Sequence, residues 1–381
     1  MGGGPATVLL AHSSSGHYGA DRQLLLIATG LDRSRYTPLV VLPAEGTLAS
    51  DLRGAGVEVH VQELSVLRRG LATARGVASV AAALARDAAQ LTGLVRGRHV
   101  ALVHSNTSVV LGGAVAASLA RVPHVWHVRE IYSRFGRIWP PYRSLLSTAS
   151  ALPCVSSAAA GQFRRGDPTQ VIHDGLAFDP RRVSRDAARR SLGLDPEEPV
   201  IAMLGRISDW KGQDVLVRAL AQPPLRERET VGLVAGEAWP GADQRAASVL
   251  ALAQELGVTD RLRLLGFRDD VETVFGAADL VAVPSTAPDP LPGSAIEAAA
   301  AGCAVIASAH GGLPEIIRDG DTGRLVAPGD PAALARAAAE LLDDTGQRER
   351  LGAAARADVR RRFSADRLLA EIQALYDSVT A

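Results

Sequence analysis

The 381-residue sequence predicts an α/β protein built from two doubly wound domains, and three observations support this prediction. First, 381 residues exceed what one hydrophobic core usually serves, so two domains are expected. Second, short apolar runs alternate with longer amphipathic stretches rich in Ala and Leu, which is typical of parallel strands joined by helices. Third, a stretch rich in Asp, Pro and Arg interrupts this alternation near the middle of the chain.

The first series of apolar runs predicts the strands of an amino-terminal domain. These strands are expected at residues 7–10, 39–42, 57–61, 100–104, 124–128, 152–155 and 171–173. Residues 1–178 are assigned to this domain. Residues 179–199 contain no apolar run, and we predict that they form the linker between the domains, with a short helix in part of it.

A second series of apolar runs predicts a carboxy-terminal domain at residues 200–363. Its strands are expected at residues 200–204, 231–235, 262–265, 280–283, 304–307 and 324–326. The chain then ends in a stretch whose apolar residues recur at helical spacing. They are Leu368, Leu369, Ile372, Leu375 and Tyr376, which predict a helix over residues 364–379.

Composition excludes several classes of function. Hydrophobic residues make up 47% of the chain and charged residues 22%, and the formal net charge is zero. No global field would therefore attract nucleic acid or an acidic membrane. Cys154 and Cys303 lie in apolar runs without metal-ligand spacing, as expected of buried thiols in a reducing compartment. Because the sequence has neither a signal peptide nor a membrane span, we expect a cytoplasmic protein with no nucleic-acid partner.

Lysine occurs once among the 41 basic residues, at Lys211. Together with Arg206 it follows the predicted strand at residues 200–204. Lysine offers a compact ammonium, whereas arginine presents a planar fork of donors, so the two suit different contacts with a phosphate or carboxylate. Either this site requires an ammonium, or a coding bias towards arginine left one lysine by chance.

A segment rich in Gly and Ser follows the first predicted strand and precedes a helical run at residues 22–28. It contains Gly16 and Gly19. Glycine lets the backbone approach a ligand, and the amides at a helix N-terminus favour an anion. The segment is neither a P-loop nor a dinucleotide fingerprint, and an ordinary strand-to-helix turn explains it as well.

Opposite charges follow two predicted strands of the second domain. Arg206 and Lys211 follow one strand, and Asp289 and Glu297 follow another. The carboxyl edge of a parallel sheet is where ligands bind, and a cation pair there suits a diphosphate whose charge develops as it leaves.

The two acids and the residues between them suit the rest of such a ligand. The carboxylate of Glu297 would accept hydrogen bonds from sugar hydroxyls, and the amides of Gly293 and Ser294 precede a predicted helix at residues 295–301. The alternative is that Glu297 complements the helix dipole and that Asp289 caps a turn.

Several motifs in this order resemble a family-4 glycosyltransferase of the two-domain GT-B fold. The most specific is the segment 289–297, DPLPGSAIE, which with residues 298–307 resembles the paired-acid motif, helix and following strand of the family. Residues 311–315, GGLPE, and residues 319–326, DGDTGRLV, follow in the same order. The resemblance covers nearly the whole chain and implies that a sugar is transferred from a nucleotide diphosphate sugar with retention.

The resemblance also implies which substrate each domain binds. The first would be a Rossmann-like acceptor-binding domain and the second a Rossmann-like nucleotide-sugar-binding domain, facing a central cleft. Residues 364–381 would return to the first domain. Closure of the cleft would exclude water, whose attack on the sugar is the competing reaction.

Roles follow residue by residue from the resemblance. Arg206 and Lys211 would bind the donor diphosphate, and Glu297 would bind both hydroxyls of the nucleotide ribose. Asp289 would hold hydroxyls of the transferred sugar, while the leaving phosphate helps to deprotonate the acceptor on the same face. Phe267 would lie near the nucleotide base.

The first domain supplies the remaining predicted site residues. Gly16 and Gly19 resemble the glycine loop that approaches the donor phosphates, and His127 occupies the position of the family histidine near the reacting sugar. Without the resemblance, His127 is a polar residue that ends a strand. We predict that His127, Asp289, Arg206 and Lys211 are catalytic. No metal is expected, because His124 and His127, three apart on a strand, would point to opposite faces.

The sequence departs from the family pattern at three positions. Asp289 stands where the family commonly has Glu, which shortens the reach to the sugar by one methylene. Pro292 replaces a glycine and has no amide to donate, so phosphate contacts would shift to Gly293 and Ser294. Tyr18 replaces one of two adjacent glycines, which places a ring near the acceptor pocket.

Residues 129–143 interleave arginines with aromatic and apolar residues. The arginines are Arg129, Arg134, Arg137 and Arg143, and the others are Tyr132, Phe135, Ile138, Trp139 and Tyr142. Aromatic residues beside cations suit a lipid headgroup interface, which would make the enzyme peripheral to the inner face of the membrane with a lipid-linked acceptor. The alternative is a loop that packs its aromatic residues inward, which would leave a soluble small-molecule acceptor.

The sequence therefore predicts a retaining, metal-independent glycosyltransferase without a cofactor. It would use a UDP- or GDP-sugar and act on a glycan, lipid-linked or small-molecule hydroxyl in polysaccharide or cell-envelope biosynthesis. Two enzyme alternatives keep the fold: a nucleotide-sugar epimerase, which needs further acid-base groups, and a sugar phosphorylase, which consumes phosphate. A third alternative is a non-catalytic subunit that binds a nucleotide sugar without turnover.

Overall fold

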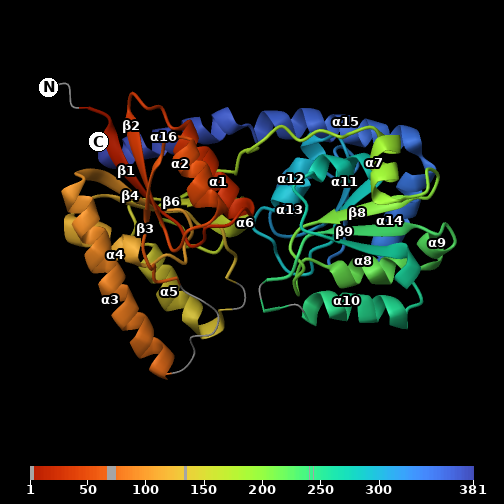
Figure 1. Cartoon of the computed structure of the whole chain (residues 1–381), viewed down its shortest axis with the longest axis horizontal. Coiled ribbons are helices and arrows are strands. Elements are labelled where there is room, and N and C mark those ends of the chain that lie inside the picture. The colour runs from red at the N-terminus through yellow and green to blue at the C-terminus, as the bar shows by residue number, and fades with distance from the viewer. Residues whose placement is uncertain (1–3, 67–73, 133–134, 240, 243) are drawn as a thin grey trace. The chain divides into compact units, whose positions relative to one another are not determined.

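The computed structural model describes residues 4–66, 74–132, 135–239, 241–242 and 244–381 of the chain. The chain divides into two compact units (Figure 1). The first unit consists of Met1–Ala177 together with Ala365–Ala381, and the second consists of Phe178–Ser364. The first unit is therefore discontinuous in sequence, whereas the second is continuous.

The first unit contains a parallel sheet of five strands in the order β3-β2-β1-β4-β5. The strands are β1 (Ala6–Ala11), β2 (Tyr36–Leu42), β3 (Glu58–Val61), β4 (Val100–Ser105) and β5 (His124–Trp126). Two further parallel strands, β6 (Leu152–Cys154) and β7 (Thr169–Val171), pair with each other. Bridges from Val125 to Ala151 and from Val128 to Cys154 place β6 beside β5.

Alternate residues of the first sheet pack into two separate cores, because successive side chains on a strand point to opposite faces. Val8 and Leu10 of β1 pack with one group of helices, and Leu9 and Ala11 pack with another. The first group is α1 (Gly19–Gly30), α2 (Thr47–Gly54) and α16 (Ala365–Thr380), and the second is α3 (Ala74–Gly97) and α4 (Gly112–Ala120). Shorter helices, η1 (Gly136–Ile138), α5 (Trp139–Leu146) and α6 (Ser157–Ala160), follow β5 and β6. Helices thus cover both faces, as expected of a doubly wound sheet.

The second unit contains a parallel sheet of six strands in the order β10-β9-β8-β11-β12-β13. The strands are β8 (Val200–Leu204), β9 (Val231–Ala235), β10 (Leu262–Gly266), β11 (Leu280–Val283), β12 (Ala304–Ser308) and β13 (Arg324–Val326). Strand order reverses between β8 and β11, the arrangement of a Rossmann-like domain.

Helices flank this sheet on both faces (Figure 1). One core joins the sheet to α8 (Gln213–Leu220), α9 (Pro223–Arg226), α10 (Gln244–Glu255) and α14 (Pro331–Asp343). The remaining helices are α7 (Arg185–Leu192), η2 (Thr259–Arg261), α11 (Val271–Ala277), α12 (Gly293–Ala300), α13 (Leu313–Ile316) and α15 (Thr345–Arg362). Helix α15 passes the start of β12 closely, because a Cβ on Gly352 would lie 2.2 Å from the carbonyl oxygen of Gly302.

The predicted fold class is confirmed: the chain is an α/β protein with two doubly wound parallel sheets. Each of the thirteen predicted strands corresponds to a strand of the structure, and the predicted closing helix corresponds to α16.

Residues 179–199 differ from the predicted linker, because they lie inside the second unit. Arg189 of α7 holds them there: its buried guanidinium donates to the carbonyl of Ala277 at 3.2 Å and to the carboxylate of Asp279 at 2.8 Å. Among the described residues, no helix is long and apolar enough to span a membrane.

Candidate functional site

The carboxyl edge of the second sheet brings two predicted site residues into contact. Lys211 follows β8 and Asp289 follows β11, and these two strands are neighbours at the point where the strand order reverses. The Nζ atom of Lys211 donates to Oδ2 of Asp289 at 2.6 Å. Open α/β sheets bind ligands in the crevice at this point, so the pair lies where a ligand is expected.

The Lys211–Asp289 pair is recessed but not sealed. The side chain of Lys211 is 20% exposed and that of Asp289 is 8% exposed. The hydroxyl of Ser285 lies 3.5 Å from the same carboxylate oxygen of Asp289. An ammonium so placed would act on an anion in the crevice with little screening by solvent.

Glycines allow the loops around this pair to pack closely. Gly212, next to Lys211, has a φ of +86°, and a Cβ there would lie 1.9 Å from the carbonyl oxygen of Pro284. Gly311 has a φ of +60°, and its Cβ would lie 2.3 Å from the carbonyl oxygen of Asp289. The amide of Gly312 donates to that carbonyl at 2.8 Å. The Gly311-Gly312 motif therefore fixes the backbone of Asp289.

Arg206 is held by an aromatic ring that sequence reasoning missed. Its guanidinium lies 3.3 Å from the ring centroid of Trp239, in the loop after β9. Trp239 is 52% exposed, so the stacked pair faces solvent. A cation–π contact of this kind orients a guanidinium without neutralising it. A Trp shortly after a predicted strand is the sequence signal that would have identified this contact.

Helix α12 begins two residues earlier than predicted, at Gly293. Pro292 is its N-cap residue, where a missing N–H costs nothing, and Gly293 and Ser294 supply the first amides. Glu297 is thus the fifth helical residue and not part of the first turn. The effect of the helix dipole falls off within that turn, which weakens the alternative that Glu297 merely complements it.

Phe267 lies at the same carboxyl edge, just after β10. Its amide donates to Oε1 of Glu237 at 3.4 Å, which links the loops after β9 and β10. Gly266 before it has a φ of +68°, and its carbonyl accepts from the amide of Gly236 at 2.7 Å. Phe267 is half-buried, so part of its ring is open to a ligand.

The first unit holds a buried polar group at the start of its glycine loop, which sequence reasoning did not identify. Nε2 of His12 lies 2.8 Å from Oδ1 of Asp21, and the amide of Tyr18 donates to Oδ2 of Asp21 at 2.8 Å. The hydroxyl of Ser14 donates to the same carboxylate. Burial alone would raise the pKa of Asp21, but hydrogen bonds from His12, Ser14 and Tyr18 outweigh burial and lower it.

Asn106 connects this group to the other strand at the reversal point of the first sheet. Its Nδ2 lies 3.1 Å from Nδ1 of His12, and its backbone carbonyl accepts from Nε of Arg129 at 2.9 Å. Arg129 also pairs with Asp174, and its side chain is 6% exposed. The strand-end residues His12, Asn106 and Arg129 thus form one network. Polar residues directly after predicted strands are the signal that would have found it.

The predicted glycines of this loop differ in their surroundings. A Cβ on Gly16 would lie 3.3 Å from Oδ2 of Asp21, so the loop packs against that carboxylate. Gly19 is exposed and is the first residue of α1, which begins three residues before the predicted helical run. Tyr18 is the N-cap residue, and its ring lies 4.9 Å from that of His17.

His127 lies just after β5 and is fully buried. Its ring stacks on His104 at 5.4 Å between centroids, and neither of its nitrogens has a hydrogen-bond partner among the residues that the structure describes. Burial, followed by the charge of Arg129, lowers the pKa of His127 well below its usual value. The ring is therefore neutral, and a substrate would reach it only after neighbouring groups move.

The aromatic residues within residues 129–143 pack inward. Tyr132 and Tyr142 are buried, and the ring of Tyr132 stacks on Trp139 at 4.8 Å. Phe135 contacts Tyr132 at 4.7 Å. The packing of these rings favours the inward alternative for the aromatic part of the segment. Arg134 lies outside the described residues.

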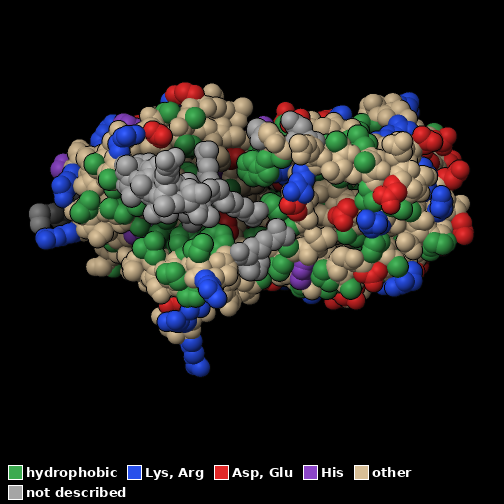
Figure 2. Space-filling view, turned by 90° about the horizontal axis from the view of Figure 1, so that it is seen from below, with side chains coloured by type: hydrophobic (Ala, Val, Ile, Leu, Met, Phe, Trp, Pro, Cys, Tyr) green, Lys and Arg blue, Asp and Glu red, His purple; other side chains and the backbone are tan. Residues whose placement is uncertain are grey.

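Charges and metal ligands add two findings. Acidic and basic side chains both occur on the face drawn in Figure 2. Within the described part of the chain, no group of three or more His, Cys, Asp or Glu side chains is placed to hold a metal ion.

Solved structures agree with this architecture. HepE from Anabaena, in complex with UDP and glucose, has a TM-score of 0.83 and 27% identity, over 98% of this chain and 100% of that chain. Sucrose-phosphate synthase from Thermosynechococcus elongatus has a TM-score of 0.78 and 21% identity, over 98% of each chain, and supports the fold alone. The chain has the GT-B fold of glycosyltransferases.

The second unit matches a known family. Residues 184–358 match the model of the family described as glycosyl transferases group 1. A D-inositol 3-phosphate glycosyltransferase from Salinispora arenicola is 39% identical over 231 residues, which are 56% of this chain and 51% of that relative. The chain thus spans about half the length of the curated relative it matches. The predicted resemblance is confirmed as far as group 1, and family 4 within it stays a prediction.

Proposed function

We propose that the protein transfers a sugar from a nucleotide diphosphate sugar to a hydroxyl acceptor, with retention and without a metal. The observation on which this proposal depends is the Lys211–Asp289 pair at 2.6 Å, located where the strand order of the second sheet reverses. A cation for the diphosphate and an acid for the sugar hydroxyls are side by side there, which matches the junction of a nucleotide sugar.

The surrounding residues extend the proposed donor site in both directions. Arg206 and the amides of Gly293 and Ser294 would add donors to the diphosphate. Glu297, one turn into α12, would accept from the ribose hydroxyls, and Phe267 would contact the base. UDP is the first nucleotide to test, because HepE was solved with UDP and with UDP-glucose.

The proposed mechanism assigns charge stabilisation to cations of the chain. As the bond to the anomeric carbon breaks, negative charge grows on the diphosphate, and Lys211 and Arg206 would offset it in place of a metal. The leaving phosphate would accept the acceptor proton on the same face of the sugar, which gives retention. Asp289 would orient the sugar hydroxyls, and neutral His127 would bind a hydroxyl of the reacting sugar.

The acceptor is the least constrained part of the proposal. The relative named for D-inositol 3-phosphate aligns with 56% of this chain, so its acceptor is one member of the panel to test. A polyol phosphate, a lipid-linked glycan and a free glycan are the three classes to compare with the same donor.

The donor site is tested by calorimetric titration of UDP, with a chelator present, into the parent and into Lys211→Ala. Loss of a hydrogen bond to a charged group costs about 1.5–3 kcal/mol, so affinity should fall roughly ten- to hundredfold. Arg336→Ala, at an exposed position on α14, serves as the control. Equal UDP affinity in the parent and in Lys211→Ala would refute the donor assignment.

Glu297→Ala tests the ribose contact separately. We expect this variant to bind UDP more weakly than the parent, but to bind a UDP analogue without ribose hydroxyls as well as the parent does. Turnover distinguishes the remaining alternatives: phosphate dependence indicates a phosphorylase, a changed free sugar nucleotide indicates an epimerase, and binding without turnover indicates a silent subunit.

A peripheral membrane contact is a second proposal, and one observation favours it. Ile138, the N-cap residue of α5, is 62% exposed, and Leu145 in α5 is 44% exposed; their spacing of seven residues places them on one side of this helix. Arg137 beside them is exposed. Vesicles containing phosphatidylglycerol should sediment the parent but not the Ile138→Asp, Leu145→Asp variant. Equal sedimentation of both proteins would exclude this surface.

A further inference from the structure

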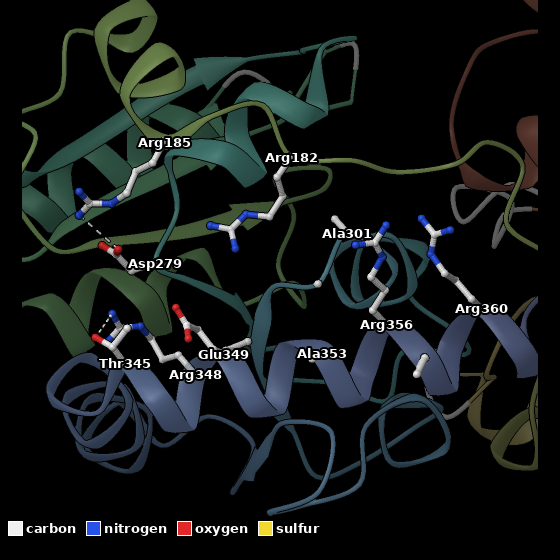
Figure 3. Close-up of a pocket in the computed structure, with 13 residues that line it drawn as sticks. Arg182, Arg185, Asp279, Ala301, Thr345, Arg348, Glu349, Ala353, Arg356 and Arg360 are labelled. Carbon is white, nitrogen blue, oxygen red and sulfur yellow. Dashed lines mark hydrogen bonds and ion pairs between the residues drawn. The ribbon is translucent and has the colours of Figure 1, made fainter.

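A pocket of about 790 Å³ lies in the second unit at the edge of the sheet opposite the donor site (Figure 3). Asp279 directly precedes β11, and Gly302 lies two residues before β12, so the pocket is located at the amino ends of these strands. Lys211 and Asp289 lie beyond the carboxyl ends of the strands. The volume of the pocket is in the range of small-molecule sites.

Arginine dominates the lining of this pocket. Its charged residues are Arg182, Arg185, Arg348, Arg356, Arg360, Asp279 and Glu349. Arg182 lies in the segment before α7, Arg185 is the first residue of α7, and the other three arginines come from α15 (Figure 3). Small residues such as Gly302 and Ala353 lie between them, which leaves room for a ligand.

Four of the five arginines have protein acceptors, and two of these four pair with carboxylates. Arg185 lies 3.4 Å from Asp279, and Arg360 pairs with Asp179. Arg348 donates to two backbone carbonyls at 2.6 and 2.7 Å. These contacts fix the walls of the pocket, and they occupy the carboxylate of Asp279.

Arg182 and Arg356 supply charge that no carboxylate among the described residues neutralises. Arg182 donates to the carbonyls of Phe275 and Ala278 at 3.0 and 2.9 Å, so its guanidinium is held in place by neutral groups. Arg356 has no hydrogen-bond or ion-pair partner among the described residues, and its Cδ passes 3.7 Å from where a Cβ on Gly302 would lie. Two guanidiniums from different elements thus remain for a ligand.

We propose that this pocket binds a small dissolved anion with two or more phosphate groups or equivalent charges, for example pyrophosphate or a phosphorylated metabolite. Guanidinium groups bind phosphate oxygens through paired N–H donors. Because Arg182 and Arg356 come from separate elements, a ligand with two anionic groups fits better than a single phosphate. The proposal does not depend on the donor site or on the proposed reaction.

The location of the pocket gives binding a mechanical consequence. Arg182 and Arg360 each lie four residues from an end of the second unit, which runs from Phe178 to Ser364. The Asp179–Arg360 ion pair already joins these two terminal segments. A bound anion would add a bridge between them, and it would therefore stabilise the second unit against unfolding.

The test is calorimetric titration of the whole chain with sodium pyrophosphate at fixed ionic strength, with a chelator present. The parent and Lys211→Ala should bind it at this pocket with equal affinity, since Lys211 lies at the opposite edge. Arg356→Glu should bind pyrophosphate at least roughly tenfold more weakly than the parent, and Arg356→Gln should also bind it more weakly. Arg336→Glu makes the same charge change at an exposed position on α14 and should leave the affinity unchanged.

Several results would overturn the proposal. They are the absence of pyrophosphate binding by the parent, parental affinity in both folded Arg356 variants, and equal weakening by Arg336→Glu, which would indicate a general charge effect. Vesicles containing phosphatidylglycerol provide the comparison with a lipid phosphate. Vesicle binding that requires Arg356, without pyrophosphate binding, would assign the pocket to a lipid headgroup and overturn the dissolved anion.

Discussion

Besides His12, three histidines of the first unit are buried at or near strand ends: His104, His124 and His127. Burial lowers the pKa of His104 and of His124 to about 3, and it lowers that of His127 well below the usual value. The hydroxyl of Tyr376 lies 2.6 Å from Nδ1 of His104, and that of Ser105 lies 3.0 Å from Nε2 of His124. All three rings are therefore neutral at physiological pH.

Acid should weaken the first unit through these three histidines. Below pH about 6.5 the unfolded chain binds protons at these histidines and the folded chain does not, so stability falls as pH decreases. At pH 5.5 the loss is about 1.4 kcal/mol for each histidine. Urea unfolding at pH 7.5 and 5.5 measures this loss, and the second unit, which contains only His310, should lose less.

Replacement of His124 isolates one contribution. In His124→Gln the amide replaces the ring beside Ser105, so the pH-dependent loss of stability should be smaller than in the parent by about one histidine. His60→Asn, at a side chain of β3 that is 37% exposed, serves as the control. An unaltered loss in His124→Gln would mean that this histidine does not contribute.

The sequence predicted which site residues follow the strands, but it did not predict most of the side chains that contact them. Lys211 and Asp289 were both identified from strand ends, and the structure places them in contact. The stacking of Arg206 on Trp239 and the pairing of His12 with Asp21 were not predicted. Strand periodicity fixes where a side chain starts, whereas such pairings depend on loop conformations that no short-range pattern specifies.

At the scale of elements, the loop after β12 supports the loop after β11. Gly311→Ala should destabilise the second unit by more than the cost of a left-handed alanine, because its Cβ would lie 2.3 Å from the carbonyl oxygen of Asp289. Gly329→Ala, with a φ of +70° and open space around it, should cost only about 1–2 kcal/mol. Urea unfolding of the two variants separates the clash from the backbone strain.

The same pair of variants tests whether the loop serves the donor site. Gly311→Ala displaces the backbone of Asp289, so sugar transfer should fall further than UDP affinity does. Gly329→Ala should retain both sugar transfer and UDP affinity. Parental transfer by a folded Gly311→Ala variant would show that the position of Asp289 is not critical.

Helices and strands were predicted where burial determines the hydrophobic pattern of the sequence. Element boundaries and the domain boundary were missed where a tertiary contact determines them. The strands of both sheets are continuous apolar runs, as expected when both faces are covered by helices. The start of α12 at Gly293 was missed, because a Gly-Ser pair after Pro292 has weak helix propensity and the helix is stabilised by packing of buried residues such as Ala295 and Ile296. Residues 179–199 resemble a linker in composition, yet Arg189 anchors them to the second unit.

At the scale of the whole molecule, the two units differ in how they can fold. The second unit is a continuous stretch, whereas the first requires α16 from the end of the chain. Leu368, Ile372, Leu375 and Tyr376 are buried against α1 and the first sheet. Their burial contributes roughly 6–12 kcal/mol, which is comparable to the whole stability of a domain.

We therefore expect the fragment 178–364 to fold alone and the fragment 4–177 to remain unfolded. A short Gly-Ser linker from residue 177 to residues 365–381 should restore the first unit, because a Cβ on Gly175 would lie only 3.2 Å from Cα of Ala365. Circular dichroism and thermal unfolding measure folding of each fragment. The fragment 178–364 should also bind UDP with affinity close to that of the parent, since the proposed contacts from Arg206, Lys211 and Glu297 all lie within it. A folded 178–364 fragment that does not bind UDP would show that residues outside the second unit are needed to hold the donor.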